Sequence, residues 1–353
     1  MVTHEAELKL PVEMCDAAGN LNPAAVGWSR KPLHGCNLSG RWGRKKRWDY
    51  WCITNQDMLF SLTLSHLDYL GLAFIYYLDF ASGKFMEQTV TRLFGKGCDL
   101  PEGLGGLIQF EDSALRMEMR DSGNDIYLRV DSPAFGGEKL HAEFQVSRPV
   151  GHETLNVVIP WSKRLYQFTS KQNCLPATGK IQIGNRKQEM GLDSFACLDF
   201  GRGIWRYASS WNWAAFSTRQ NGHTVGVNMG GKWTDGTGMT ENGICLDGRL
   251  SKIGEDLLFD YDPGNFMKPW SIRTPQSEQI RLEFTPFFER IAKTDALVLR
   301  SEVHQMIGRF CGTVITDDGE QISIQDAIGW AEEHQARSEE RRVGKECRSR
   351  WSA

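Results

Sequence analysis

Segments in which apolar and polar residues alternate recur along most of the chain. Eight of them follow one another between residues 48 and 147, separated by brief turn sequences such as Asn55-Gln56-Asp57 and Asp121-Ser122-Gly123-Asn124. Alternation with a period of two is typical of β-strands. The pattern predicts strands at 48–55, 58–68, 70–80, 84–94, 107–112, 114–121, 125–131 and 139–147.

The second half of the chain continues this organisation. The turn sequence Gln220-Asn221-Gly222 separates two strand-like segments, and Asn-Gly is the strongest short-range signal for a β-hairpin. The pattern predicts further strands at 204–216, 223–233, 244–252, 257–261, 280–285 and 305–316.

One late segment, 324–335, is predicted to be a helix. Ser323 and Asp326 resemble a capping box at its start. Several apolar side chains then fall on one helical face, namely those of Ile324, Ala327, Ile328 and Ala331.

Many short, evenly spaced strands favour closed antiparallel sheets, because closure removes the unpaired edges that invite aggregation. The stretch SKQNCLPATGK at 170–180 is typical of a linker and divides the strands into two groups. We therefore expect an all-β protein with one short C-terminal helix. Its two packed barrels or sandwiches are expected at 21–175 and 176–336.

The last seventeen residues, 337–353, differ from the rest of the chain. They have no apolar periodicity and hold six Lys/Arg against three Asp/Glu. The run 337–352 resembles the translation of a sequencing adapter fused to a truncated reading frame, so we exclude it from the arguments on fold and function. The alternative interpretation is a natural basic tail.

Composition restricts the class of protein. Without the tail, the chain is more acidic than its formal net charge of −3, which argues against nucleic acid as the main partner. The N-terminus has no apolar core of the kind that a secretory signal requires. The longest apolar run, 70–78, is far shorter than the roughly 20 residues of a membrane helix. We expect a soluble cytoplasmic protein without an integral membrane segment.

Neither a metal nor a cofactor is expected. The cysteines of residues 1–336 are scattered without a CxxC pair, and the histidines have no spacing typical of metal ligands. The glycines between 230 and 238 follow a strand but precede no helix, so they are interpreted as turn and bulge residues rather than a phosphate-binding loop.

The segment 199–247 carries four of the twelve tryptophans of the chain. In an extended strand alternate side chains share one face. An aromatic face edged by a few polar groups is what a pocket for an apolar or ring-shaped ligand needs. The alternative is that these rings simply fill a barrel interior. The residues placed on one face are Trp205, Tyr207, Ser209, Trp211 and Trp213.

Three carboxylic acids in this segment are candidate proton donors: Asp199, Asp235 and Glu241. A carboxylic acid in an apolar pocket has a raised pKa and is therefore suited to general acid catalysis at neutral pH. Structural roles remain open for them. Asp199 is a possible buried partner of Arg202 or Arg206, and Asp235 precedes a glycine, as turn residues often do.

Basic and aromatic residues also alternate between 42 and 51. Such a pattern suits single-stranded nucleic acid, but the acidic character of the chain favours a solvated turn followed by a core strand. A third interpretation is that this segment contacts the anionic head group of a ligand. Trp48, Tyr50 and Trp51 are then expected to help build the cavity.

Long motifs of the chain resemble the family described as domain of unknown function 2804. The motifs are GIWRYASSWNWAAF, GVNMGGKWTDGTGMTENGICLDGRLSKI and MKPWSI in the second half, and NPAAVGWSRKPLHGCNLSGRWGRKKRWDYWCI and SHLDYLGLAFIYYLDF in the first. The likeness runs from about Leu21 to Ala336. At the level of the fold, the family is similar to two-domain lipocalin-like proteins, which include carotenoid 1,2-hydratases. The resemblance implies two lipocalin-like barrels and a long apolar ligand, but no catalytic residue.

Three functions remain open. The first is binding of a hydrophobic lipid- or terpenoid-like small molecule in a barrel or in the cleft between domains. The second is a cofactor-independent hydratase, isomerase or cyclase, in which tryptophan faces stabilise a cation. The third is binding or cleavage of a carbohydrate. The residues expected to contact the ligand are Trp48, Trp51, Arg202, Trp205, Arg206, Tyr207, Trp211, Trp213, Asn228 and Trp233.

Overall fold

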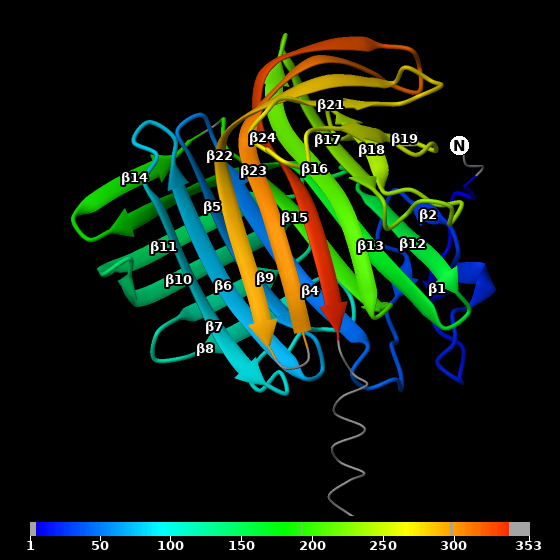
Figure 1. Cartoon of the computed structure of the whole chain (residues 1–353), viewed down its shortest axis with the longest axis horizontal. Coiled ribbons are helices and arrows are strands. Elements are labelled where there is room, and N and C mark those ends of the chain that lie inside the picture. The colour runs from blue at the N-terminus through cyan, green and yellow to red at the C-terminus, as the bar shows by residue number, and fades with distance from the viewer. Residues whose placement is uncertain (1–4, 192, 297–298, 339–353) are drawn as a thin grey trace, which may run out of the picture.

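The computed structural model describes residues 5–191, 193–296 and 299–338. Of the tail expected at 337–353, Arg337 and Ser338 belong to the last strand, and the remainder lies outside the described residues. Within these residues the protein consists of β-strands, turns and one 3₁₀ turn at Pro23–Ala25. Strands β1 (Val12–Glu13) and β3 (His34–Gly35) form a small parallel pair. All other strands belong to two large sheets (Figure 1). None of the helices described there could span a membrane.

The first sheet contains thirteen strands, whose main path runs β7-β6-β5-β4-β15-β13-β11-β10-β9-β8. Every described pair in this sheet is antiparallel. Its strands are β2 (Trp28–Ser29), β4 (Lys45–Thr54), β5 (Met58–His66), β6 (Leu70–Asp79), β7 (Phe85–Leu93), β8 (Gly106–Glu111), β9 (Arg116–Asp121), β10 (Asp125–Phe135), β11 (Glu138–Ser147), β12 (Leu155–Ser162), β13 (Leu165–Ile183), β14 (Arg186–Met190) and β15 (Phe195–Ile204).

The second sheet contains nine strands in the order β19-β18-β17-β16-β24-β23-β22-β21-β20, again with antiparallel pairs. Its strands are β16 (Ala208–Gln220), β17 (His223–Gly231), β18 (Asn242–Leu246), β19 (Arg249–Ile253), β20 (Leu258–Asp260), β21 (Trp270–Arg273), β22 (Ile280–Ala296), β23 (Leu299–Ile315) and β24 (Gln321–Ser338).

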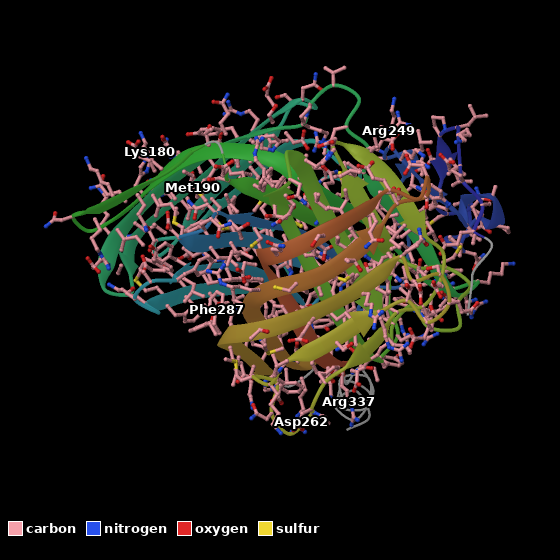
Figure 2. All side chains as sticks on the ribbon, turned by 90° about the horizontal axis from the view of Figure 1, so that it is seen from above. Lys180, Met190, Arg249, Asp262, Phe287 and Arg337 are labelled. Carbon is pink, nitrogen blue, oxygen red and sulfur yellow. The ribbon has the colours of Figure 1, made fainter. Side chains whose placement is uncertain are left out.

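The two sheets pack against each other. In Figure 1, β22–β24 (yellow to red) lie in front of β4–β6 (blue to cyan), and Figure 2, seen from above, shows two layers, with Phe287 on the second sheet and Lys180 on the first. A shared core joins them: Tyr50 of β4 and Tyr76 of β6 pack with Trp213 of β16 and Trp330 of β24. Each sheet also encloses a core of its own.

Strands between two cores are buried on both faces. In β4, Trp51 and Ile53 point into the core of the first sheet, whereas Tyr50 and Cys52 point toward the second sheet. Such strands lose the simple alternation of apolar and polar residues. The face that β4 turns toward the second sheet also carries the cavity described below.

The all-β prediction with two packed antiparallel sheets is confirmed. The eight strands predicted between 48 and 147 correspond to β4–β11. The segment predicted as one strand at 244–252 is instead a hairpin of β18 and β19, turned at Asp247 and Gly248 with positive φ angles.

The predicted C-terminal helix is wrong, because its residues belong to β24 and pair with β16 and β23. Ala327 and Ala331 point into the core of the second sheet, while Trp330 points toward the first sheet. Burial on both faces produces an apolar run that imitates a helical face. Asp326, expected at a helical cap, has a φ of 50° near an irregularity in the pairing with β23.

The linker predicted at 170–180 is also wrong, because it lies within the long strand β13. The first half of β13 pairs with β12 and β15, and its second half pairs with β11 and β14. The pairing with β15 shifts register between Gln172 and Leu175, and Cys174 there has a φ of 60°. Of the polar residues that suggested a loop, Asn173 lies in this irregularity, whereas Lys171 pairs regularly with β15 and Lys180 with β11.

The chain passes from the first sheet to the second between β15 and β16. This crossing, at residues 205–207, lies inside the segment that the sequence assigns to the second domain. The domain division at 175/176 stays a prediction.

Candidate functional site

A cavity of about 710 Å³ lies between the two sheets. The first sheet lines it with alternate side chains of β4, β5, β6 and β7, joined by residues of β13 and β15. The second sheet contributes side chains of β16, β22, β23 and β24. The volume falls within the roughly 300–1,000 Å³ of typical ligand pockets.

Five tryptophans line this cavity: Trp48, Trp205, Trp211, Trp213 and Trp233. The Trp205 ring lies parallel to that of Trp233, with centroids 5.8 Å apart and 12° between the planes. It meets Trp48 and Trp211 edge-on, at 5.7 and 5.6 Å. The rings of Trp48, Trp205, Trp211 and Trp233 therefore form one continuous aromatic wall, and Trp213 lines the cavity beside Tyr50, which it meets edge-on at 5.6 Å.

Hydrogen bonds fix the orientation of these indoles. The Nε1 groups of Trp205 and Trp213 donate to Gln167 Oε1 at 2.6 Å and to Asn228 Oδ1 at 2.8 Å. Those of Trp211 and Trp233 donate to carboxylates, Glu332 Oε1 at 2.9 Å and Glu241 Oε1 at 2.7 Å. Since these four N–H groups are satisfied within the protein, a ligand can cover the apolar ring faces without leaving them unpaired.

A buried charged triad adjoins the wall. Lys171 Nζ lies 3.0 Å from Asp199 Oδ1 and 3.2 Å from Glu241 Oε2, and the Glu241 side chain is 1% exposed. Burial raises the pKa of Glu241, and Lys171 opposes that shift. The two carboxylates in turn raise the pKa of the Lys171 ammonium to about 12 against the effect of its burial. Lys171 Nζ also lies 4.4 Å from the centroid of the Trp213 ring.

Glu332 of β24 is the acid of the opposite wall. Burial raises its pKa to about 7, although the hydrogen bond from Trp211 and the charge of Lys171 favour ionisation. Its side chain lines the cavity. At neutral pH a substantial fraction of Glu332 therefore carries a proton, as a general acid requires.

Beside Glu332 the second sheet presents His334 and Ser301, with His334 Nε2 2.7 Å from Ser301 Oγ. The His334 ring lies 3.7 Å from the Trp211 ring, centroid to centroid. Burial, together with the charges of Lys46 and Arg290, holds the pKa of His334 well below its ordinary value. His334 is accordingly neutral at pH 7.

A second polar network lies where β22 and β23 meet β6. Arg290 is paired with Glu87, and its guanidinium carbon lies 4.4 Å from the centroid of the Tyr76 ring. Tyr76 donates to Gln305 Oε1 at 2.8 Å, and its hydroxyl lies 2.7 Å from that of Tyr50. Arg290 and Gln305 are therefore held in place on the cavity wall.

The structure brings eight of the residues expected from the sequence to the cavity: Asp199, Glu241, Tyr50 and the five tryptophans. Asp199 is bound to Lys171 and accepts a hydrogen bond from Thr169 Oγ1 at 3.2 Å, rather than pairing with Arg202 or Arg206. Asn228 does not line the cavity. Its side chain accepts a hydrogen bond from Trp213 Nε1 and donates one to the Glu241 carbonyl oxygen.

The other expected residues do not line the cavity. Asp235 is an exposed turn residue whose carboxylate accepts from the Lys232 amide. Arg206 is exposed near Trp161, and Tyr207 is covered by the guanidinium of Arg44.

Arg202 and Trp51 are buried in the first sheet. The Arg202 side chain is fully buried and is paired with Asp49 at 2.8 Å; it also donates to the Pro101 carbonyl oxygen. Trp51 belongs to the core of that sheet. Both point away from the face that carries Trp48 and Tyr50, because neighbouring residues of a strand face opposite sides.

Several cavity residues were not anticipated from the sequence. Lys171 lies in the segment interpreted as a linker, and Glu332 and His334 lie in or beside the segment interpreted as a helix. Had those segments been assigned as strands, alternation would have placed Lys171 on the same face of its strand as Thr169. It would likewise have placed Glu332 and His334 on the same face of theirs as Trp330. In the described part of the chain, no three metal-ligating side chains gather closely enough to hold a metal ion.

Residues 5–338 match the sequence model of the family described as domain of unknown function (DUF2804). The chain belongs to the DUF2804 family. This confirms the resemblance seen in the sequence motifs. No curated protein matches this DUF2804 chain in sequence.

Several solved structures are similar to the DUF2804 chain. CghA, crystallised with Sch210972, has a TM-score of 0.49 and 11% identity, covering 96% of this chain and 97% of its own. Kievitone hydratase from Nectria haematococca has a TM-score of 0.47 and 8% identity, covering 94% and 98%. A protein described as a candidate AttH from Nitrosomonas europaea has a TM-score of 0.49 and 12% identity, covering 82% and 92%. At these values the three proteins say nothing about what this chain binds or catalyses.

Proposed function

We propose that the protein binds a hydrophobic, lipid- or terpenoid-like small molecule between its two sheets. The observation that carries this proposal is the cavity of about 710 Å³, walled by five tryptophans, four of which already have their N–H groups satisfied. An apolar ligand gains free energy by covering such ring faces, and it leaves none of these donors unpaired.

The cavity is too large to be a packing defect. Protein interiors are close-packed, with few voids larger than a water molecule. A volume near 710 Å³ between two well-packed cores therefore needs a function that maintains it. A sugar also stacks on indoles, but it requires many hydrogen-bond partners, whereas the polar groups of this cavity are largely bound to one another.

The aromatic wall is tested by replacing its tryptophans one at a time. We expect Trp211→Ala and Trp213→Ala each to weaken binding of retinol, a neutral apolar probe, by about tenfold or more, because a buried aromatic contact contributes roughly 1–2 kcal/mol or more. Dissociation constants from isothermal titration calorimetry provide the measurement.

The matched control is Trp42→Ala. Trp42 is 58% exposed and does not line the cavity, so its replacement is expected to leave the dissociation constant unchanged. Unfolding curves of each variant identify any that fail to fold. Retinol affinities that are unchanged in folded Trp211→Ala and Trp213→Ala would contradict the proposal.

A second candidate function is proton transfer to a carbon–carbon double bond of the ligand, as in a hydratase, isomerase or cyclase without a cofactor. The observation that favours it is Glu332, an acid with a pKa near 7 facing a cavity walled by indoles. Indole faces stabilise a developing cation by about 0.5–2 kcal/mol per contact. In this proposal Glu332, rather than Asp199, supplies the proton, because Asp199 is held by Lys171 and Thr169.

A further inference from the structure

The cations of the cavity differ in how they are paired. Lys171 is bound by Asp199 and Glu241, Arg290 by Glu87, and Lys293 by Glu302 at 2.7 Å. Lys46 lines the same cavity, yet no ion pair to its ammonium exists among the described residues. The cavity therefore contains one ammonium group whose charge is not balanced by a carboxylate of the described chain.

The position of Lys46 follows from the alternation of β4. Lys46 and Trp48 face the cavity, whereas Arg47 faces the opposite side, where its Nη2 lies 3.1 Å from His66 Nδ1. Just before the strand, Arg44 donates to the Trp205 carbonyl oxygen at 3.1 Å. Of the four consecutive basic residues at 44–47, only Lys46 lines the cavity.

The surroundings of Lys46 do not neutralise it. Its Nζ lies 4.9 Å from the centroid of the Trp205 ring, and a ring face attracts a cation without cancelling its charge. Burial alone lowers the pKa of Lys46, to about 8, so the ammonium form prevails at neutral pH. The nearby His334 is neutral, and its Nε2 is bonded to Ser301.

We propose that Lys46 binds the carboxylate of the ligand, and hence that the ligand is an apolar carboxylic acid whose hydrocarbon body lies along the tryptophan wall. An ammonium that is partly withdrawn from water without a counter-ion is costly, and a monoanionic ligand balances the half-buried Lys46 with one charge. A neutral ligand would cover the half-buried Lys46 and leave its charge unpaired. This inference rests on the proposed function and names the chemical class of its ligand.

The test compares acids and alcohols that share one hydrocarbon body. Retinoate is paired with retinol, and palmitate with hexadecanol, and dissociation constants are measured for the parent protein and for Lys46→Met and Lys46→Arg. We expect the parent to bind each acid about ten- to a hundredfold more tightly than its alcohol, as one charge-assisted hydrogen bond in a buried site allows. Lys46→Met should abolish this preference, and Lys46→Arg should retain most of it.

The outcomes separate this inference from the function on which it rests. Equal affinity of the parent for acid and alcohol would overturn the role of Lys46 while supporting an apolar cavity. An equal loss of both ligands in Lys46→Met would also overturn it, because the side chain would then act through its shape. Failure of all four probes to bind the parent would contradict the proposed function, and the inference with it.

Discussion

Lys171→Met is expected to lower the free energy of unfolding by about 3–5 kcal/mol, because it leaves two buried carboxylates without their cation. Lys171 Nζ lies within 3.2 Å of both Asp199 and Glu241, and its side chain is 5% exposed. The methionine fills a similar volume, so the loss reports the missing charge rather than a void. Chemical denaturation at pH 7 provides the measurement.

One further variant and a comparison of two pH values control this experiment. Lys171→Met/Glu241→Gln removes one of the stranded charges and should recover part of the loss. The Lys171→Met variant should also lose less stability at pH 5 than at pH 8, since carboxylates that have lost their cation take up protons more readily. A Lys171→Met protein as stable as the parent at both pH values would mean that the triad contributes nothing to folding.

Glu332→Gln is expected to change how stability depends on pH. The folded pKa of Glu332 is raised to about 7 from an ordinary 4.5, so between these values the folded state holds a proton that the unfolded state has released. Stability of the parent therefore falls as pH rises through this window. Relative to Glu332→Gln, the parent should lose roughly 3 kcal/mol between pH 4.5 and pH 7. Denaturation curves across that range measure the difference.

Glu333→Gln is the matched control, because Glu333 lies next in β24 and faces the other side. Lys232 and Tyr261 contact its carboxylate, and hydrogen bonds and charge from these groups lower the pKa of Glu333 despite its burial. Its contribution to stability is present above the ordinary pKa and is lost as pH falls through the lowered one. The two variants should therefore show opposite trends; the same trend in both would contradict the assignment for Glu332.

The second candidate function, proton transfer, predicts a separate effect of replacing Glu332 on turnover. If the protein transfers a proton to its ligand, Glu332→Gln should retain binding and lose turnover by about 10²–10⁴-fold, as expected for a missing general acid. Product formation from an unsaturated ligand, followed by mass spectrometry in deuterated water, provides the measurement. Unchanged turnover in Glu332→Gln would exclude Glu332 as the donor.

The fold could be predicted from the sequence wherever a strand buries one face or ends in a clear turn. The strands β8–β11 alternate between buried and more exposed residues over most of their length, and the pattern identified them. It failed for β24, where Trp330 and Ala331 are buried against different cores. It failed for β13 because an irregularity around Cys174 interrupts the strand with polar residues.

The same errors decided how much of the site could be predicted. Trp211 and Trp213 were placed on one face by alternation, and both line the cavity. Lys171 and Glu332 could not be predicted as cavity residues, because a residue in a supposed linker or helix cannot be assigned to a face of a sheet. The pairing of Lys171 with Glu241 joins β13 to the residue just before β18, and spacing along the chain contains no signal for such a contact.

Native mass spectrometry of the purified protein, alongside analysis of its organic extract, shows most plainly whether the cavity between the sheets holds an apolar ligand. We expect one apolar molecule per chain, which is lost from a Trp211→Ala/Trp213→Ala variant and retained by Trp42→Ala. A protein that carries no such molecule, and that also fails to bind fatty acids, sphingolipids and polyenes when these are added, would contradict the proposed function.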